Sequence, residues 1–581
     1  MSESASTPAD EPDAGEPNSI VENTNIQPIA ARPFLPNSLL AVGLIAAVVI
    51  GVAQWLPPWL DYQYANLFTM VATLIFVVYG LFVLQRAASS RGQRFVVPIG
   101  TLATIGVFFT LFRHDGYSGE TWPLFSWRFA SQQHAPLQEA PLIETTNDAI
   151  DAADAAEKTE AIALADSAQF LGPNRNGVVK DRLFAIPKTD ADVKVLWNQS
   201  IGDGWASFAV HHDRAVTLEQ RDDQECVTCY RLSDGKLLWI DQHPARHEQA
   251  LGGVGPRSTP TITNGKVFAM GALGFLRALD LETGERVWTK DFLDEAGWTV
   301  EEFAAAAPWG HASSPLLIPS DDGLSPTLVL GFGGPVDPNA VDNDGMTPTA
   351  KSLIALGTAT GETRWKAGQD QFSYASPMLM TLAGTPQIVS VNEKTISGHD
   401  VQTGYVLWSH PWPGQTNSAA NCAAAIPIPG DRFVIGKGYS GGSAVVKVNR
   451  AAADDWLVES EWSSNRVLQT KFNHTVVAGD IGFGLNNGTL QAVDLNTGDS
   501  KWMQSRRERF GQGQLLLVGD VLISQTESGD VVFVAADANE YRELGRLDAL
   551  NSKTWNIPTI AGRHLIVRND RQTICYLLPA K

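Results

Sequence analysis

Hydrophobic positions divide the chain into two parts, and the first part is a series of long apolar runs. Three of them, about Leu39 to Leu56, Tyr64 to Leu84 and Phe95 to Phe112, contain no charged residue. Each is about long enough to cross a hydrocarbon core as a helix. A buried helical core or a cleaved signal also gives apolar runs, but three in succession after an acidic tail do not fit a signal peptide. We therefore predict an acidic disordered tail over residues 1–36 and three transmembrane helices within residues 37–114.

From about residue 168 to the end, the pattern changes to short apolar strands separated by polar turns. A Thr-Gly or Asp-Gly turn followed four residues later by tryptophan occurs at glycines 235, 284, 361, 404 and 498. Two of the separations are close to about 45 residues, the length of one small antiparallel sheet in a repeat protein. Glycine supplies the positive φ that the turn needs, and the tryptophan gives each sheet a large apolar surface to bury against the next one. This combination predicts sheets packed radially as blades.

The number of blades follows from the outer-strand positions. These are Trp197, Trp239, Trp288, Trp365, Trp408, Trp462, Trp502 and a degenerate eighth at Leu544 to Leu547. Trp197 precedes any complete blade, whereas the chain ends in an inner segment, Thr573 to Leu578, with no outer strand after it. We predict that the two ends share one blade and close the ring, which leaves no long exposed edge. The predicted fold is an all-β, eight-bladed β-propeller over residues 168–581, preceded by the three helices.

The repeat resembles a known family. Its turn and tryptophan, in an eight-bladed ring, are similar to the pyrroloquinoline-quinone-like (PQQ-like) repeats that quinoprotein dehydrogenases share with the lipoprotein of the outer-membrane β-barrel assembly machinery. Five further segments resemble membrane-tethered bacterial members of this family: Phe170–Gly177, Gly255–Pro260, Trp309–Pro315, Tyr374–Pro377 and Lys553–Pro558. The resemblance is specific for the fold and implies little about activity, because unrelated functions share a fold.

Charged residues around the apolar runs indicate an orientation. The connection after the second run carries Arg86, Arg91 and Arg94 with no acid, and the connection after the first carries no Lys or Arg. Basic loops stay in the cytoplasm, so we predict a cytoplasmic N-terminus and an extracytoplasmic, periplasmic propeller. Tryptophans at 55, 59, 122 and 127 lie where interfacial aromatics are expected. Residues 115–167, rich in Ala, Glu and Asp, are predicted to be a charged tether.

Composition excludes several classes of partner and site. With 43 Lys plus Arg against 63 Asp plus Glu, the formal charge is −20, which disfavours binding to nucleic acid or anionic lipid. Cys226 and Cys229 have the spacing of metal or redox cysteines, but on a strand residues three apart point to opposite faces, too far apart for a disulfide. Neither a second such pair nor a His pair completes a zinc site, so we expect ordinary strand cysteines and no metal.

The candidate binding site is a ring of side chains just upstream of each innermost strand. It comprises Trp205, Arg257, His311, Tyr374, Asn421, His474, Gln512 and Asn556. We expect them to crowd one mouth of the axial funnel, either satisfying backbone groups and water or forming a pocket or partner surface. His311 and His474 lack the short spacing of metal ligands, so no metal is predicted there.

No catalytic set is recognisable. The resemblance to quinoprotein dehydrogenases implies a clamp of adjacent cysteines over the quinone and carboxylate and amide ligands for its cation. This sequence has no Cys-Cys pair and no confident match to those ligands, so neither a cofactor nor PQQ with calcium is expected. The leading hypothesis is a membrane-anchored, non-catalytic propeller that binds a protein partner in the cell envelope, as in envelope protein assembly. The alternatives are a PQQ-dependent or other oxidoreductase, and a small-ligand sensor that uses the axial funnel.

Overall fold

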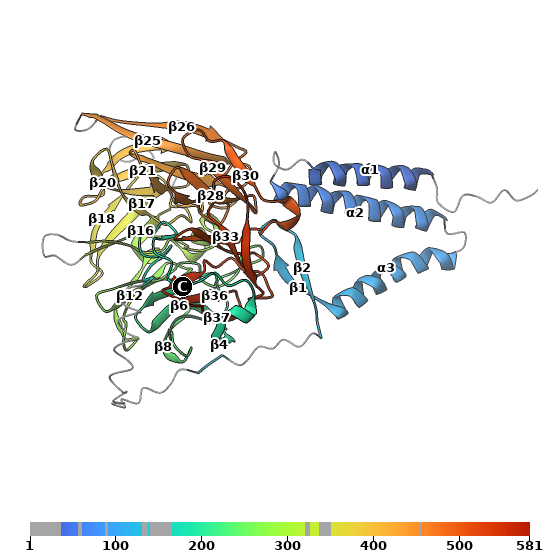
Figure 1. Cartoon of the computed structure of the whole chain (residues 1–581). Helices are drawn as coiled ribbons and strands as arrows, with labels where there is room; N and C mark the ends of the chain where they lie inside the picture. The colour runs from blue at the N-terminus through green and yellow to red at the C-terminus, as the bar shows by residue number, and fades with distance from the viewer. Residues whose placement is uncertain are drawn as a thin grey trace, which may run out of the picture.

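The chain folds into a β-propeller from which three helices project on one side (Figure 1). The computed structural model describes residues 37–55, 61–87, 91–129, 137–139, 166–319, 326–335, 350–452 and 455–581. The predicted acidic tail and most of the predicted tether lie outside these ranges. Residues 112–127, part of which we assigned to the tether, form a hairpin instead: β1 (Phe112–Tyr117) pairs with β2 (Pro123–Trp127).

The three helices coincide with the three apolar runs. They are α1 (Asn37–Trp55), α2 (Tyr62–Ala87) and α3 (Arg91–Leu111). By length and composition, α1 and α2 are candidates for membrane spans, whereas the apolar part of α3, Phe95–Leu111, is shorter than the other two. Three helices are therefore confirmed, but only two of the three predicted spans, α1 and α2, are long and apolar enough to count as candidate membrane spans. Their apolar side chains are largely exposed, which is typical of a surface that another apolar phase covers.

Eight four-stranded antiparallel units form the propeller, as predicted. In chain order the first four are β5–β8 (Ala209–His211, Arg214–Arg221, Gln224–Arg231, Leu237–Pro244), β11–β14 (Thr261–Thr263, Lys266–Met270, Phe275–Asp280, Arg286–Asp291), β15–β18 (Leu316–Ile318, Thr327–Gly333, Lys351–Gly357, Thr363–Ala367) and β19–β22 (Met378–Leu382, Thr385–Val391, Thr395–Asp400, Val406–Pro411). The next three are β23–β26 (Ile426–Ile428, Arg432–Lys437, Gly442–Ala452, Asp455–Ser464), β27–β30 (Val476–Ala478, Ile481–Asn486, Thr489–Asp494, Ser500–Met503) and β31–β34 (Gln514–Val518, Val521–Gln525, Val531–Ala535, Glu543–Leu547). Small additions are β9 (Glu248–Gln249), β10 (Gly253–Val254), α5 (Phe292–Ala296) and α6 (Val300–Ala306), together with short 3₁₀ turns at Asp190–Asp192 and Arg506–Glu508.

The last blade closes the ring in the predicted way. It combines three C-terminal strands, β35 (Thr559–Ala561), β36 (His564–Arg568) and β37 (Gln572–Leu577), with the early strand β4 (Lys194–Ser200). Strand β4 pairs antiparallel with β37, with Trp197 opposite Cys575. The degenerate eighth outer strand, at Leu544 to Leu547, is β34.

The blade tryptophans pack on the turn glycines of the next blade. A Cβ placed on Gly284 would lie 2.6 Å from the ring of Trp239, and one on Gly235 would lie 2.7 Å from the ring of Trp197. The indole N–H of Trp239 donates to the Leu281 carbonyl of the following blade at 2.9 Å. The glycine therefore serves two purposes, because it adopts a left-handed φ of 76° at position 284 and leaves room for the neighbouring indole.

Candidate functional site

A cavity of about 550 Å³ lies at the axial mouth on the side of the helices. Side chains from several blades line it together with residues near the start of α2 and from the β1–β2 turn. Its aromatic lining consists of Tyr64, Phe170, Trp205, Trp309, Tyr374, Tyr439, Phe472 and Trp555. This volume is within the range of roughly 300–1,000 Å³ that is usual for small-molecule sites.

One wall of the cavity is the N-terminal part of the chain itself, which docks on the propeller through a buried ion pair. The Asp61 carboxylate, at the start of α2, lies 3.1 Å from the Lys471 ammonium group, and both side chains are 1% exposed. Asp61 also accepts the backbone N–H of Tyr439 at 2.8 Å. Because a buried charge is costly without a partner, these contacts hold α2 at one place on the mouth.

The β1–β2 turn completes this wall. Both carboxylate oxygens of Glu120 accept from the Arg509 guanidinium, which makes a bidentate ion pair. Burial raises the pKa of Glu120, and the positive charge of Arg509 acts in the opposite direction. The backbone N–H of Gly119 donates to the Glu527 carboxylate at 2.5 Å, and the Gly119 carbonyl accepts from Lys471 at 3.3 Å. We call residues Asp61–Tyr64 and Ser118–Thr121 the cap.

The floor of the cavity is a segment that enters the axial channel from before the first blade. Residues 167–179, which we call the plug, bond inner strands of several blades: Ser167 pairs with Val210, and β3 (Val178–Val179) runs parallel to β31. The buried Arg175 guanidinium donates to the carbonyls of Ser314, Pro315 and Pro377. Phe170, from the same segment, contacts the His474 ring edge-on and lines the cavity.

The structure divides the predicted axial ring into two groups. Trp205, Arg257, Tyr374 and His474 line the cavity. The other four are buried and are not among the lining residues: His311, Asn421, Gln512 and Asn556. The amide of Asn556, for example, donates to the carbonyls of Gly204 and Ala206 in the adjoining segment, and Asn421 donates to the carbonyls of Asn392, Glu393 and Trp412. Their binding role stays a prediction.

The serines beside these ring residues join neighbouring blades. Ser314 donates its backbone N–H to the Ser376 hydroxyl at 2.9 Å and accepts from the Thr259 N–H at 2.9 Å. At the closing blade, the backbone N–H of Ile557 donates to the Ser207 hydroxyl at 2.9 Å. Part of the predicted ring thus has a structural role, because it satisfies backbone groups around the axis.

Among the described residues, Arg257 is the one charged side chain in the lining of the cavity, and it has no acidic partner. Its guanidinium donates to the carbonyls of Gly255 at 2.9 Å and Gly252 at 2.7 Å, and no carboxylate of the described residues pairs with it. Burial lowers its pKa to about 10, so it remains protonated at neutral pH. Two of its five N–H donors are used, and the other three have no partner among the described residues.

The two histidines of the ring are neutral at physiological pH. Burial lowers the pKa of both His311 and His474 to about 4. The Nδ1 atom of His474 accepts the backbone N–H of Ala424 at 3.0 Å, so in the neutral ring the proton is on Nε2. His311 stacks on Phe372 and bonds the Gly331 carbonyl through Nε2. Proton transfer near pH 7 would need a less perturbed imidazole.

The cavity does not provide the ligands of a calcium–quinone centre. Among the described residues that line it, none is Asp or Glu. Calcium takes six to eight oxygen ligands, usually with carboxylates among them. Cys226 and Cys229 lie on β7 away from the lining, and burial raises the pKa of each thiol to about 12, which makes them unreactive at neutral pH.

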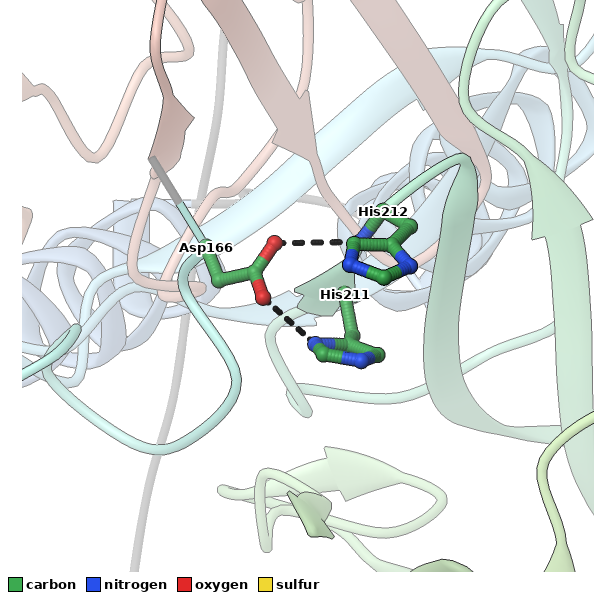
Figure 2. Close-up of side chains that lie close together, drawn as sticks. All are labelled: Asp166, His211 and His212. Atoms are coloured by element: carbon green, nitrogen blue, oxygen red, sulfur yellow. Dashed lines mark hydrogen bonds and ion pairs between the residues drawn. The ribbon is translucent and has the colours of Figure 1, made fainter. Parts of the chain in front are cut away.

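One further cluster of metal-ligand type lies at the β5–β6 turn (Figure 2). Asp166 faces two stacked imidazoles, accepting from the ring of His211 at 2.5 Å and from the backbone N–H of His212 at 3.0 Å. His212 adopts a left-handed φ of 53°. The carboxylate therefore braces a tight hairpin turn whose side chains are partly exposed to solvent.

Sequence analysis missed the residues that form the cap contacts. Asp61 is the one acid between the first two apolar runs, and that isolation was the available signal. Nothing in the sequence indicated its partner, because Lys471 lies 410 positions further along the chain.

Comparisons with known proteins agree with the architecture. The family model described as "Outer membrane protein assembly factor BamB" matches residues 186–297 and 297–456. The protein of that name from Shewanella oneidensis is 25% identical over 320 residues, which cover 54% of this chain and 71% of the relative. The one from Moranella endobia is 25% identical over 267 residues, covering 42% and 66%.

Two solved structures are matched with TM-scores below 0.5. BamB from Moraxella catarrhalis has a TM-score of 0.45 at 13% identity, covering 66% of this chain and 100% of that chain. A europium-containing methanol dehydrogenase has a TM-score of 0.40 at 12% identity, covering 71% and 91%. From its repeats, its eight blades and its sequence relatives, this chain is a PQQ-like propeller related to the outer membrane protein assembly factor BamB.

Proposed function

We propose that this chain is a membrane-anchored, non-catalytic propeller that binds protein partners outside the cytoplasm, in the assembly of envelope proteins. The observation that carries the proposal is the docked cap. Because Asp61 and Glu120 join the helices to the axial mouth, the propeller is held in one orientation on its anchor, and the blade rims are left for partners. The relatives named as outer membrane protein assembly factors support the same class of role.

We infer that the rim of the β23–β26 blade is the partner surface, because its outer strands are long. Strands β25 and β26 have 11 and 10 residues, and β26 is the edge of its sheet. Leu457 on β26 is 55% exposed. A long edge with unpaired backbone groups and exposed apolar side chains can accept a strand from another protein.

The test is site-specific photo-crosslinking in intact cells. A benzophenone side chain at Leu457 should crosslink the propeller to the same envelope protein in repeated experiments. The matched control carries the label at Val287, which is 45% exposed on the outer strand β14 of a different blade and should give no such product. No reproducible product from Leu457, or the same products from both sites, would contradict the rim assignment.

The proposed orientation has the N-terminus in the cytoplasm and the propeller in the periplasm. In Figure 1, α1 approaches the propeller, α2 leaves it and α3 returns, so all three helices extend across the same layer. At 1.5 Å per residue, the 21 residues of α3 extend about 31 Å, about the thickness of a hydrocarbon core. This supports a third crossing. Protease added to spheroplasts should digest the propeller, and protection of the propeller would overturn the orientation.

We also propose that the protein works without a quinone cofactor. The carboxylate-free lining of the axial cavity supports this, because a calcium ion bound there would lack its usual ligands. Incubation of the detergent-solubilised full chain with pyrroloquinoline quinone and calcium should give no bound quinone absorbance and no dye reduction with alcohols. A stoichiometric quinone spectrum after desalting would refute this part of the proposal.

A further inference from the structure

We propose that the cavity between cap and plug binds an amphiphilic anion, a long-chain carboxylate drawn from the membrane, with its acid on Arg257 and its chain among the aromatic side chains. This ligand site goes beyond the proposed partner binding and does not depend on it. Three features carry the inference: an unpaired cation, an apolar chamber of suitable volume, and a location beside the membrane helices.

The charge argument concerns Arg257. A partly buried cation without a carboxylate has lost hydration that its two carbonyl partners replace only in part. The guanidinium has three N–H groups left, and its planar fork suits the two oxygens of a carboxylate. The carbonyl of Gly252 also accepts the indole N–H of Trp205, which fixes the floor of this subsite.

Two polar side chains of the lining are already held by backbone carbonyls. The Tyr374 hydroxyl donates to the Thr416 carbonyl at 2.9 Å, and the Gln514 amide donates to the carbonyls of Phe472 and Trp555. Arg257 is the one charged residue among the described residues of the lining, so we expect the acidic group of the ligand there and its chain against the aromatic walls.

The apolar body of the ligand has a chamber of about 550 Å³ with aromatic walls. Trp205 and Trp555 lie 4.8 Å apart, and Trp309 meets Tyr374 edge-on at 5.6 Å. The Lys553 ammonium covers the first pair, 4.3 Å from the ring of Trp555, and donates to the carbonyl of Tyr117 in β1. Lys553 is not among the residues that line the cavity, whereas Arg257 is, so Arg257 is the anion site.

The location points to the membrane as the source. Tyr64 on α2 and Thr121 in the cap line the cavity, and Trp122 beside it is 45% exposed. Exposed tryptophans next to apolar helices mark the membrane–water boundary. An amphiphile dissolved in the membrane would thus be concentrated at the level of the cavity.

The experiment is native mass spectrometry of the full chain released from detergent, with palmitate, hexadecanol or lysophosphatidate added. We expect one palmitate per chain and little hexadecanol. Arg257→Gln should reduce palmitate affinity about tenfold or more, because it removes a charge-assisted pair. The matched control is Arg231→Gln, which removes an exposed arginine paired with Asp234 and should leave affinity unchanged.

A second variant tests the chamber rather than the charge. Ala312 lines the cavity, so Ala312→Phe should fill it and abolish palmitate binding without changing the melting temperature. The proposal is overturned if hexadecanol binds as well as palmitate, if Arg257→Gln or Ala312→Phe binds palmitate like the wild type, or if lysophosphatidate binds and palmitate does not. The comparison of ligands on the wild type stands even if a variant fails to fold.

Discussion

The contact between a turn glycine and the indole of the preceding blade gives a quantitative prediction. In Gly284→Ala the new Cβ would lie 2.6 Å from Cδ2 of Trp239, so the indole must move. The alanine also has to adopt a φ of 76°, which costs about 1–2 kcal/mol. Displacing the ring adds about 1–3 kcal/mol of strain, and loss of the 2.9 Å bond from Trp239 to the Leu281 carbonyl adds about 1 kcal/mol.

The matched control is Gly265→Ala. Gly265 has a similar left-handed φ of 67°, but a Cβ there meets nothing within 4 Å. Gly265→Ala therefore loses only the free energy of placing an alanine at a positive φ. Gly284→Ala should be less stable than this control by a further ~2–4 kcal/mol, from the displaced ring and the lost hydrogen bond. For a domain of about 400 residues, 1 kcal/mol shifts the melting temperature by about 1 °C. Thermal unfolding followed by tryptophan fluorescence should thus separate the two variants by about 2–4 °C. Equal melting temperatures would show that the indole relaxes freely and that packing between blades does not require glycine.

Three further predictions concern the cap, the ring closure and pH. Asp61→Asn should leave the Lys471 ammonium buried and unpaired, which costs about 3–5 kcal/mol of docking and increases hydrogen exchange in the cap; adding Lys471→Met should restore most of the protection. Truncation after Gly562 removes β36 and β37 and leaves β4 without its partner, so the propeller should unfold cooperatively, and an unchanged melting curve would refute the closure. Burial, followed by the charge of Asp570, raises the pKa of Asp203 to about 6. Between about pH 4 and 6 the folded state then holds a proton that the unfolded state has lost, so this group makes stability fall as pH rises, and Asp203→Asn should remove that component from thermal melts.

The local parts of the fold could be predicted because they repeat. Glycine and tryptophan at a fixed offset identify a turn and an outer strand, and the unmatched Trp197 strand indicated the shared blade. What the repeat does not encode is which blade a tryptophan contacts. Trp239 packs on Gly284 of the following blade, whereas the Trp408 indole donates to Gln387 of its own blade, because the next blade has no Thr-Gly turn at that place.

The site could be predicted only in part. The rule that site residues lie just before each innermost strand correctly placed Trp205 and Arg257 in the lining of the cavity. The same rule also selected Asn556, which is fully buried and donates to backbone carbonyls. A register rule finds residues at equivalent places and does not say which of them face the axis and which turn toward the next blade. The cap contacts were out of reach, because a pair such as Asp61 and Lys471 leaves no local pattern in either segment.

The plug connects two sequence motifs that lie far apart in the chain, the segment around Arg175 and the Ser-Pro motifs of the inner strands. Arg175 belongs to the segment before the propeller, and the carbonyls it bonds belong to the Ser-Pro motifs that begin the inner strands β15 and β19. The Pro315 carbonyl also accepts from the hydroxyl of Thr261, in β11 of the preceding blade, at 2.6 Å. Burial lowers the pKa of Arg175 to about 9, so it is still charged at neutral pH and donates to carbonyls of two blades at once. The plug is therefore part of the propeller fold. The plug and the cap both contribute residues to the axial cavity, Phe170 from the plug and Thr121 from the cap, so the segments outside the blades shape this site as much as the blades do.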